Sequence, residues 1–145
     1  MLLILLFLIN NKMNVNKQPL QSCSSNNTAL TGFTRNGKCE YLDNDKGSHH
    51  VCLDIDTNPN FCTTTGQPNW CSKKSQCHDS EQMCDKKDWC VCQWAFSSAV
   101  DNIGCDNLKV NCAATNINAY EDFRKDPKYI SALDCLRKKC QILDN

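Results

Sequence analysis

The thirteen cysteines of this 145-residue chain constrain its fold more than any other feature, and they are spread from Cys23 to Cys140. So many thiols are typical of proteins that fold in an oxidising compartment and are cross-linked there by disulfides. A chain of this length can bury a core without covalent help, so small size alone does not explain the cysteines. We therefore expect a disulfide-stabilised domain in an extracellular or lumenal environment.

An apolar run without charge occupies residues 2–9. Its length suits the hydrophobic region of a secretory signal peptide and is far below the roughly 20 residues that span a bilayer. No basic residue precedes the run, and no clear small-residue cleavage motif follows it. We predict a signal-like segment, cleaved or retained as a weak anchor, and hence a location outside the cell or in the secretory-pathway lumen.

The stretch that follows, residues 10–31, is rich in Asn, Ser, Gln and Thr, and this composition predicts a flexible lead-in. It contains an N-glycosylation sequon at Asn26. It also contains Cys23, which we expect to be the odd thiol because thirteen cysteines cannot all pair internally. The chain thus divides into a signal-like segment with its lead-in, residues 1–31, and a cysteine-rich domain, residues 32–145.

The other twelve cysteines are the candidates for disulfides within this domain. They are Cys39, Cys52, Cys62, Cys71, Cys77, Cys84, Cys90, Cys92, Cys105, Cys112, Cys135 and Cys140. Helical geometry excludes one pairing, because Cys135 and Cys140 on one helix have Cα atoms about 8 Å apart, whereas a disulfide spans roughly 4.4–6.8 Å. Each is expected to bond elsewhere, to the sheet or to the 62–92 loop.

Short strands are predicted where strand-forming residues gather or where polar and apolar residues alternate. Residues 50–55 and 108–112 alternate in this way, and residues 89–92 are rich in strand formers. Residues 93–100 are compatible with a short helix. Residues 57–69, with two prolines and a glycine, are expected to be a loop.

The best-defined predicted element is a C-terminal helix. Asp126 suits its N-terminal cap and Pro127 its first position, and apolar residues then recur at helical spacing. Strands early in the chain and helices late, without regular alternation, predict an α+β fold. We expect a small, mostly antiparallel sheet with a C-terminal helix, all stapled by disulfides.

Three sequence blocks carry a resemblance to a known family. They read GFTRNGKC at residues 32–39, DKGSHHVC at residues 45–52 and WCVC at residues 89–92. In this order they resemble the domain of unknown function 2237 family, which consists mostly of small bacterial proteins. The resemblance implies a compact α+β domain, and it implies no activity because the function of that family is unassigned.

The chain departs from the family pattern in two places. A different, cysteine-bearing segment at residues 62–87 stands where the family has its middle segment. Asn116 stands where the family has a histidine, and an asparagine cannot transfer protons near neutral pH. Of the thirteen cysteines, four match the family pattern and nine do not.

The four family-like cysteines raise the alternative of a thiolate metal site or a thiol enzyme; they are Cys39, Cys52, Cys90 and Cys92. Structural zinc sites favour paired C-x-x-C motifs, and redox enzymes favour C-x-x-C at a helix start. The chain has no C-x-x-C motif, so disulfides are the favoured interpretation. We assign no metal, no cofactor and no catalytic residue, and an enzyme is disfavoured.

One polar group of residues qualifies as a candidate ligand site: Arg35, Asp45, His49 and Thr115. An arginine binds anions bidentately, so such a group suits an anion or a small ligand. The alternative, which we favour, is a structural Arg–Asp pair with a histidine that fixes the turns. Tryptophans 70, 89 and 94 likewise either line a groove or, as is commoner beside half-cystines, pack in the core.

Charge excludes some partners. Sixteen basic and sixteen acidic side chains balance to a net charge of zero, so no global field holds nucleic acid or a membrane surface beyond the N-terminal segment. The partner remains unknown, and self-association is possible through an odd thiol. The chain is predicted to be a secreted or lumenal binding or structural module. The alternatives are a thiolate metal-binding domain or enzyme of unknown reaction, and a covalently linked extracellular fibre or matrix subunit.

Overall fold

The computed structural model describes the backbone of residues 1–143 and the side chains of residues 1–6 and 11–143. In chain order the elements are α1 (Leu2–Asn10), β1 (Val51–Asp54), α2 (Phe61–Thr64), β2 (Ser75–Gln76), β3 (Met83–Cys84), β4 (Asp88–Val91), α3 (Gln93–Asn102), α4 (Ile117–Lys125) and α5 (Ile130–Cys140). Short 3-10 helices occur at Cys105–Asn107, Cys112–Ala114 and Pro127–Tyr129. β1 pairs with β4 and β2 with β3, both antiparallel. The α+β class, the small antiparallel sheet and the C-terminal helix are confirmed.

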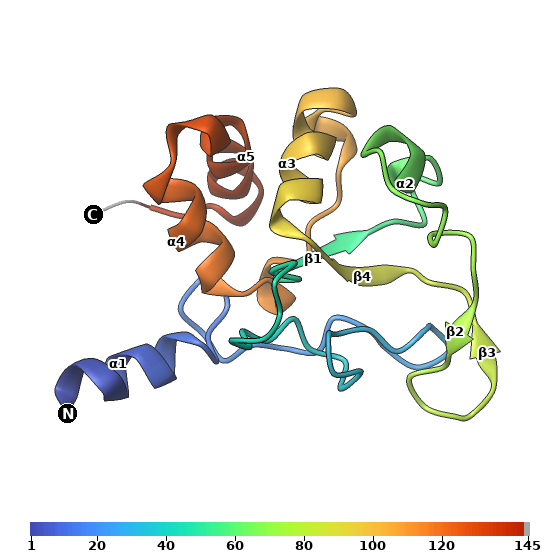
Figure 1. The fold of residues 1–145 in the computed structure, drawn as a ribbon, viewed down its shortest axis with the longest axis horizontal. Coiled ribbons are helices and arrows are strands. Elements are labelled where there is room, and N and C mark those ends of the chain that lie inside the picture. Colours follow the sequence, from blue (N-terminus) through green and yellow to red (C-terminus); the bar gives the residue numbers. More distant parts are fainter. Residues whose placement is uncertain (144–145) are drawn as a thin grey trace.

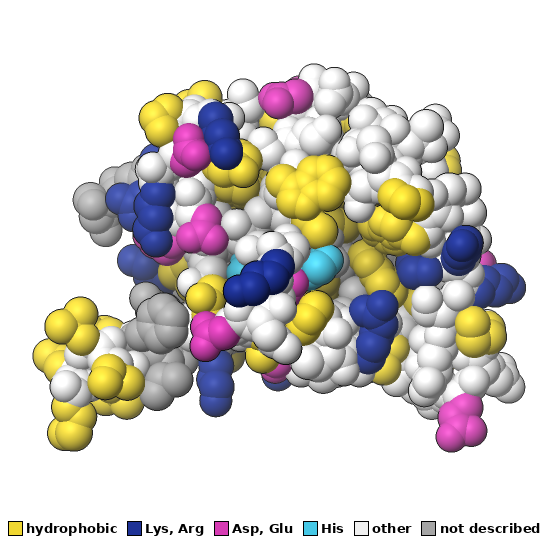
Figure 2. Space-filling model, viewed as in Figure 1, with side chains coloured by type: hydrophobic (Ala, Val, Ile, Leu, Met, Phe, Trp, Pro, Cys, Tyr) yellow, Lys and Arg dark blue, Asp and Glu magenta, His cyan; other side chains and the backbone are white. Residues whose placement is uncertain are grey.

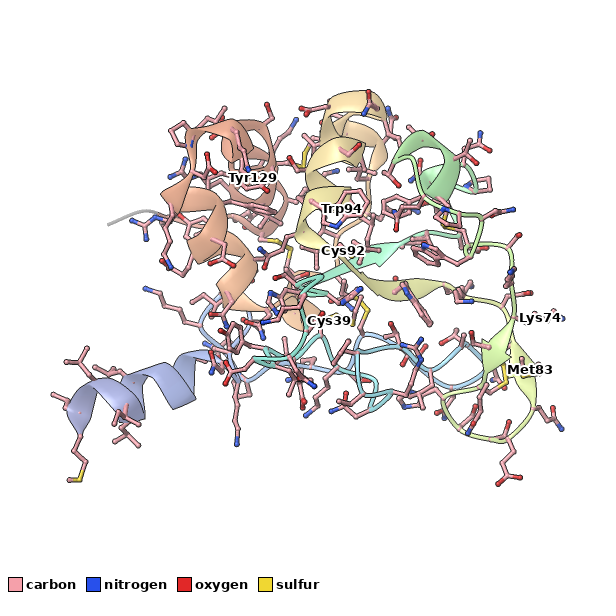
Figure 3. All side chains as sticks on the ribbon, viewed as in Figure 1. Cys39, Lys74, Met83, Cys92, Trp94 and Tyr129 are labelled. Atoms are coloured by element: carbon pink, nitrogen blue, oxygen red, sulfur yellow. A yellow bond between two sulfur atoms is a disulfide. The ribbon has the colours of Figure 1, made fainter. Side chains whose placement is uncertain are left out.

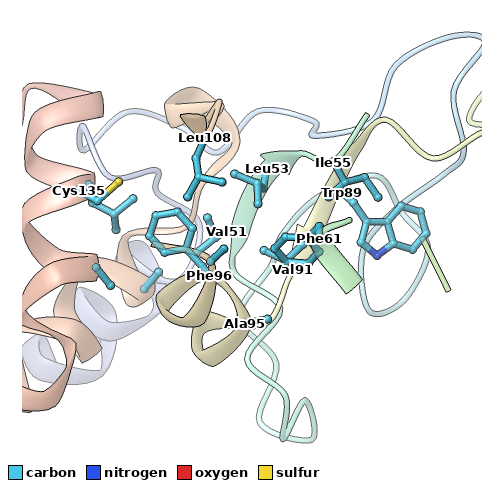
Figure 4. Packing of buried hydrophobic residues seen from close by; sticks show 14 of the residues in the cluster. Val51, Leu53, Ile55, Phe61, Trp89, Val91, Ala95, Phe96, Leu108 and Cys135 are labelled. Carbon is cyan, nitrogen blue, oxygen red and sulfur yellow. The ribbon is translucent and has the colours of Figure 1, made fainter. Parts of the chain in front are cut away.

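The β1–β4 ribbon has two different faces because side chains alternate along a strand. One face carries four apolar side chains, which pack into the main core (Figure 4): Val51, Leu53, Trp89 and Val91. On the other face Cys52 is the register partner of Cys90, and both cysteines are buried in a second, smaller cluster. The ribbon therefore joins a hydrophobic core on one side to a disulfide cluster on the other.

Helices α2 to α5 gather on one side of the ribbon (Figure 1), where α3 contacts both α2 and α5. Phe96 of α3 stacks on Phe123 of α4 with ring centroids 6.1 Å apart. Asp126 caps the 3-10 turn that contains Pro127 and leads into α5, because its side chain accepts a hydrogen bond from the Lys128 N–H. The predicted signals at the start of the C-terminal helix are thus present as expected.

Residues 13–31 pack against the domain rather than forming the predicted flexible lead-in. Val15, Leu20 and Ala29 are buried. Backbone hydrogen bonds tie this stretch to distant segments, for example from the Val15 N–H to the Thr115 carbonyl at 3.0 Å. Its polar side chains also bond to main-chain groups, so a polar composition here accompanies order without regular secondary structure. The packed part of the chain consequently begins before the predicted boundary at residue 32.

The apolar segment at the N-terminus forms α1, which projects from the rest of the molecule (Figures 1 and 2). The side chains of residues 2–6 are exposed. Among the described residues, no helix is both long and apolar enough to cross a membrane.

Within residues 1–143 twelve cysteines form six disulfides. The pairs are Cys23–Cys52, Cys39–Cys90, Cys62–Cys71, Cys77–Cys84, Cys105–Cys135 and Cys112–Cys140. As expected from helical geometry, Cys135 and Cys140 bond to cysteines elsewhere. Their partners lie in the 105–112 segment, not in the sheet or the 62–92 loop. That segment forms one isolated bridge, Leu53 to Val110, instead of the predicted strand.

The prediction that Cys23 is the odd thiol is wrong. Cys23 is buried and bonds to Cys52, while Cys92 is the free cysteine among the described residues. The physical reason is that residues 13–31 fold onto the disulfide face of the ribbon, where a hydrogen bond from the Cys23 N–H to the Gly37 carbonyl holds them at 2.7 Å. An intermolecular link through Cys23 is thereby removed as a basis of the fibre alternative, which also allowed for another odd thiol.

Candidate functional site

A cavity of about 430 Å³ lies where the three family-like blocks meet the cysteine-bearing segment at residues 62–87. It is lined by residues from the stretches 32–35, 67–75 and 86–92, together with His49. This volume is within the range of small-molecule sites. The cavity is therefore the natural place to look for ligand chemistry, and the sequence segments that form it are widely separated in the chain.

Two cations lie against one tryptophan of this cavity. The Arg35 guanidinium carbon is 5.0 Å, and the Lys86 Nζ 5.1 Å, from the centre of the Trp89 ring. Such contacts between a cation and an aromatic face are attractive. Trp70 lies 6.0 Å from Trp89, ring centre to ring centre, so two indoles form an adjoining aromatic wall.

Lys86 is buried, and its ammonium group is bonded to backbone rather than to a carboxylate. It donates to the carbonyl oxygens of Trp70, at 3.2 Å, and of Lys73. Burial lowers the pKa of Lys86, and the neighbouring Arg35 lowers it further. The cysteine-bearing segment at residues 62–87 thus contributes a cation to the cavity.

Arg35 stands at the exposed rim of the cavity on a tight turn. Its backbone has a positive φ of 57°, and its Nη1 donates to the Gly32 carbonyl at 2.6 Å. Gly32 itself has a φ of 99°, and a Cβ at this position would lie 2.7 Å from the Lys38 carbonyl oxygen. Glycine is required there, which explains why the first block begins with it.

His49 and Asp45 form a hydrogen-bonded pair beside the cavity. The buried Asp45 carboxylate accepts from the His49 Nδ1 at 2.7 Å and from the His49 backbone N–H at 3.0 Å. Burial by itself would raise the pKa of Asp45, but these bonds from His49 outweigh it and hold that pKa below its ordinary value. With Nδ1 donating to the carboxylate, Nε2 of His49 has its lone pair available as an acceptor.

Cys92 carries the free thiol and lies where β4 ends and α3 begins (Figure 3). It is half-buried and lines the cavity together with His49. Burial raises the pKa of the Cys92 thiol, and the Asp45 carboxylate raises it further. The thiol is therefore protonated at neutral pH. The sequence predicts Cys92 as a disulfide candidate, whereas the structure leaves it unbonded.

The predicted polar group is brought together only in part. Arg35 and His49 both line the cavity, and Asp45 lies behind His49. Thr115 is elsewhere: its buried hydroxyl accepts from the Cys52 N–H at 3.1 Å and donates to the Asn111 carbonyl at 2.8 Å. Thr115 thus supports the ribbon and not the cavity.

The three tryptophans and Asn116 lie in different parts of the structure. Trp70 and Trp89 line the cavity, whereas Trp94 is exposed and lies outside its lining. Asn116 is buried and caps α4, and its Nδ2 donates to the Cys39 carbonyl at 3.1 Å. Asn116 therefore serves the framework of the fold.

Two polar cavity residues, Gln67 and Lys86, are not identified as site residues by the sequence reasoning, and Cys92 is identified only as a disulfide candidate and as one of four cysteines in the alternative of a metal site or thiol enzyme. Gln67 and Lys86 lie in the segment at residues 62–87, which contains no motif that would place them beside Arg35. The sequence does not distinguish Cys92 from the other twelve cysteines as the free thiol. The convergence of the three family-like blocks on one cavity is the signal that could have indicated it.

The zinc alternative built on the four family-like cysteines is wrong. Cys39 is bonded to Cys90, and Cys52 to Cys23, so these sulfurs are not available as thiolates. The sulfurs of Cys23, Cys39 and Cys90 do lie within 4.8 Å of one another. This proximity arises because two disulfides pack side by side on one face of the ribbon.

A second histidine, His50, is buried next to this site. Its Nδ1 contacts the Gln93 Oε1 at 2.5 Å, and the Gln93 Nε2 donates to the Asp122 Oδ2 at 3.1 Å. Its Nε2 has no hydrogen-bond partner among the described residues. Burial lowers the pKa of His50, because protonation would place an unpaired N–H in the interior.

This buried histidine predicts a pH-dependent stability. In the unfolded chain His50 takes up a proton near its ordinary pKa, and in the folded chain only at lower pH. The free energy of unfolding should therefore fall as the pH drops from about 7 to 5, by about 1.4 kcal/mol for each unit between the two pKa values. Chemical denaturation of the wild type and of His50→Gln at both pH values tests this. The variant should show a smaller fall, and equal falls in the two proteins would contradict the assignment.

Comparison with known proteins agrees with the family resemblance. A family model described as "Uncharacterized protein conserved in bacteria (DUF2237)" matches residues 13–126. No curated protein matches the chain. The matched range starts where the chain begins to pack, includes every residue that lines the cavity, and ends before α5. The chain belongs to the DUF2237 family.

Proposed function

We propose that this protein is a secreted or lumenal domain that binds a small organic anion in the cavity beside Trp89. The observation that carries the proposal is the charge of the lining. The cations Arg35 and Lys86 line the cavity, and no carboxylate is among its described lining residues. This local excess of cations contrasts with a net charge of zero for the whole chain.

The arrangement of these groups supports a particular class of ligand. Arg35 lies at the rim, where its Nη1 donates a hydrogen bond to the Gly32 carbonyl of its own turn. The other N–H groups of its guanidinium can bind a carboxylate. The indoles of Trp70 and Trp89 offer an apolar wall for the body of the molecule. We infer a ligand with one carboxylate attached to a small, planar or apolar body.

Secretion is supported by independent features. Disulfides of this number persist in oxidising compartments. The apolar α1 precedes the packed domain, and the sequon residue Asn26 is exposed, as glycosylation of the folded chain requires. A domain that is cross-linked by six disulfides suits a binding module that works outside the cell.

Binding of benzoate tests the proposal. We expect benzoate to bind and the neutral benzamide to bind at least 10-fold more weakly, as followed by calorimetry and by the indole N–H signals of the tryptophans. Arg35→Gln should weaken benzoate binding about 10-fold, which corresponds to about 1.4 kcal/mol. Arg35→Lys should recover part of the loss, because an ammonium group keeps the charge without the bidentate geometry.

Lys46→Gln is the matched control, since Lys46 is an exposed cation near the same turns and does not line the cavity. It should bind benzoate as the wild type does. Equal affinity for benzoate and benzamide, or an equal effect of Arg35→Gln and Lys46→Gln, would contradict an anion site at this cavity.

A further inference from the structure

We propose that Cys92 is a nucleophile, with His49 as its general base, and that it reacts with an electrophilic carbon of a small carboxylate held in the cavity. This inference rests on the anion site proposed above and adds a chemical step to it. Its ligand class is narrower: a carboxylate that carries a carbon open to attack by sulfur.

The first support is the placement of the two groups. Cys92 and His49 line the same cavity. The chain on either side of them is held together by a hydrogen bond from the Gln93 N–H to the Ser48 carbonyl at 3.1 Å. Cys92 precedes Gln93 in the chain and His49 follows Ser48. This hydrogen bond therefore holds the end of β4 beside the turn that carries His49.

The second support is the orientation of His49. Its Nδ1 is bonded to the buried Asp45 carboxylate at 2.7 Å, which fixes the ring and leaves Nε2 as the proton acceptor. A carboxylate, an imidazole oriented by it and a thiol within one site are the elements of an activated cysteine. The same carboxylate stabilises the imidazolium that forms when His49 takes a proton.

The third support is the state of the thiol. Among the described residues Cys92 is free while the other cysteines are bonded in pairs. It immediately precedes α3, a ten-residue helix whose N-terminal dipole favours the negative charge that develops on sulfur during attack. Because burial and Asp45 keep the resting thiol protonated, the reaction needs a base, and His49 supplies it.

The reaction of Cys92 with such a carboxylate needs no third reactant. With iodoacetate as the probe, the Cys92 Sγ forms a bond to the methylene carbon, the carbon–iodine bond breaks and iodide leaves. The thiol proton passes to the His49 Nε2 and then to solvent. With an unsaturated carboxylate, sulfur adds to the β-carbon and His49 returns the proton to the α-carbon, so nothing leaves.

Alkylation rates of the unreduced protein, followed by mass spectrometry, test the inference. Iodoacetate and the neutral iodoacetamide are compared on the protein and on N-acetylcysteine. We expect the iodoacetate-to-iodoacetamide rate ratio to be at least 10-fold higher for the protein. Cys92→Ser should abolish labelling. Arg35→Gln should remove the preference for iodoacetate, whereas Lys46→Gln should leave both rates as they are in the wild type.

His49→Asn and His49→Gln should slow both reagents at least 10-fold, and circular dichroism confirms that each variant folds. The outcomes separate the two proposals. A rate ratio equal to that of N-acetylcysteine would overturn both the anion site and this inference. A retained preference with rates unchanged in both His49 variants would overturn the assignment of His49 as the general base and leave the anion site standing.

Discussion

Replacing Cys39 and Cys90 together by alanine is expected to lower the free energy of unfolding by about 4 kcal/mol. This disulfide joins residues 51 positions apart, the largest separation of the six, and the loss of chain entropy that a cross-link imposes on the unfolded state grows with loop length. It also fastens the 32–39 block to β4, next to the cavity. Guanidinium denaturation of the unreduced protein measures the change.

The control is the double variant Cys77→Ala/Cys84→Ala. Its disulfide closes only seven positions across the β2–β3 hairpin, so the same argument gives about 2 kcal/mol. Both double variants keep Cys92 as the single free thiol, which makes them comparable. Equal losses in the two variants, or a larger loss from the hairpin, would show that loop closure does not govern these cross-links.

Phe96→Ala is expected to lower the free energy of unfolding by about 3–5 kcal/mol. The ring is fully buried on α3 and stacks on Phe123 of α4, so its removal leaves a cavity between the helices and the β1–β4 ribbon. Thermal and guanidinium unfolding of the variant measure the effect. The disulfides limit the unfolded state but cannot fill this space, so they do not offset the loss.

Trp94→Ala is the matched control for this prediction, because Trp94 lies on the same helix and is 46% exposed. A large aromatic residue is removed in both variants, but most of the contacts of Phe96 are internal. Trp94→Ala should cost about 1 kcal/mol or less. A loss similar to that of Phe96→Ala would mean that α3 is held by its outer face and not by the helix-to-helix core.

The prediction of local elements succeeded where a few adjacent residues decide the backbone. Asp126 and Pro127 sit at the start of the C-terminal helix as their chemistry suggests, and the spacing of Cys135 and Cys140 correctly excluded their pairing. The strands at residues 50–55 and 89–92 were placed by the same kind of local evidence. They form the observed β1 and β4 with small shifts at their ends.

The prediction of a flexible lead-in failed because it used amino-acid composition to judge whether a segment packs against the domain. Residues 13–31 look disordered because they are polar, yet Val15 and Leu20 reach the core and Cys23 reaches Cys52. A polar stretch becomes ordered when its side chains bond to the main chain of other segments, and no single-chain composition reports this. The assignment of the odd thiol failed with it.

The residues of the candidate site likewise fall into those that the sequence indicates and those that only the structure places there. Arg35, Asp45 and His49 could be nominated from turn-rich blocks with charged residues, but Thr115 could not be separated from them. The buried Lys86 and the free Cys92 join the site through contacts between segments more than 30 positions apart along the chain.

By itself, therefore, the sequence determined the class of this protein: a disulfide-rich α+β domain of the DUF2237 family with a C-terminal helix. Those properties depend on residue types, on local caps and on three short blocks. Only the tertiary structure decided which cysteines pair, that Cys92 stays free, and that it shares a cation-lined cavity with His49. Disulfide pairing and cavity formation depend on which distant segments meet in space. Because the thirteen thiols are chemically identical, the residues around each cysteine do not specify its partner.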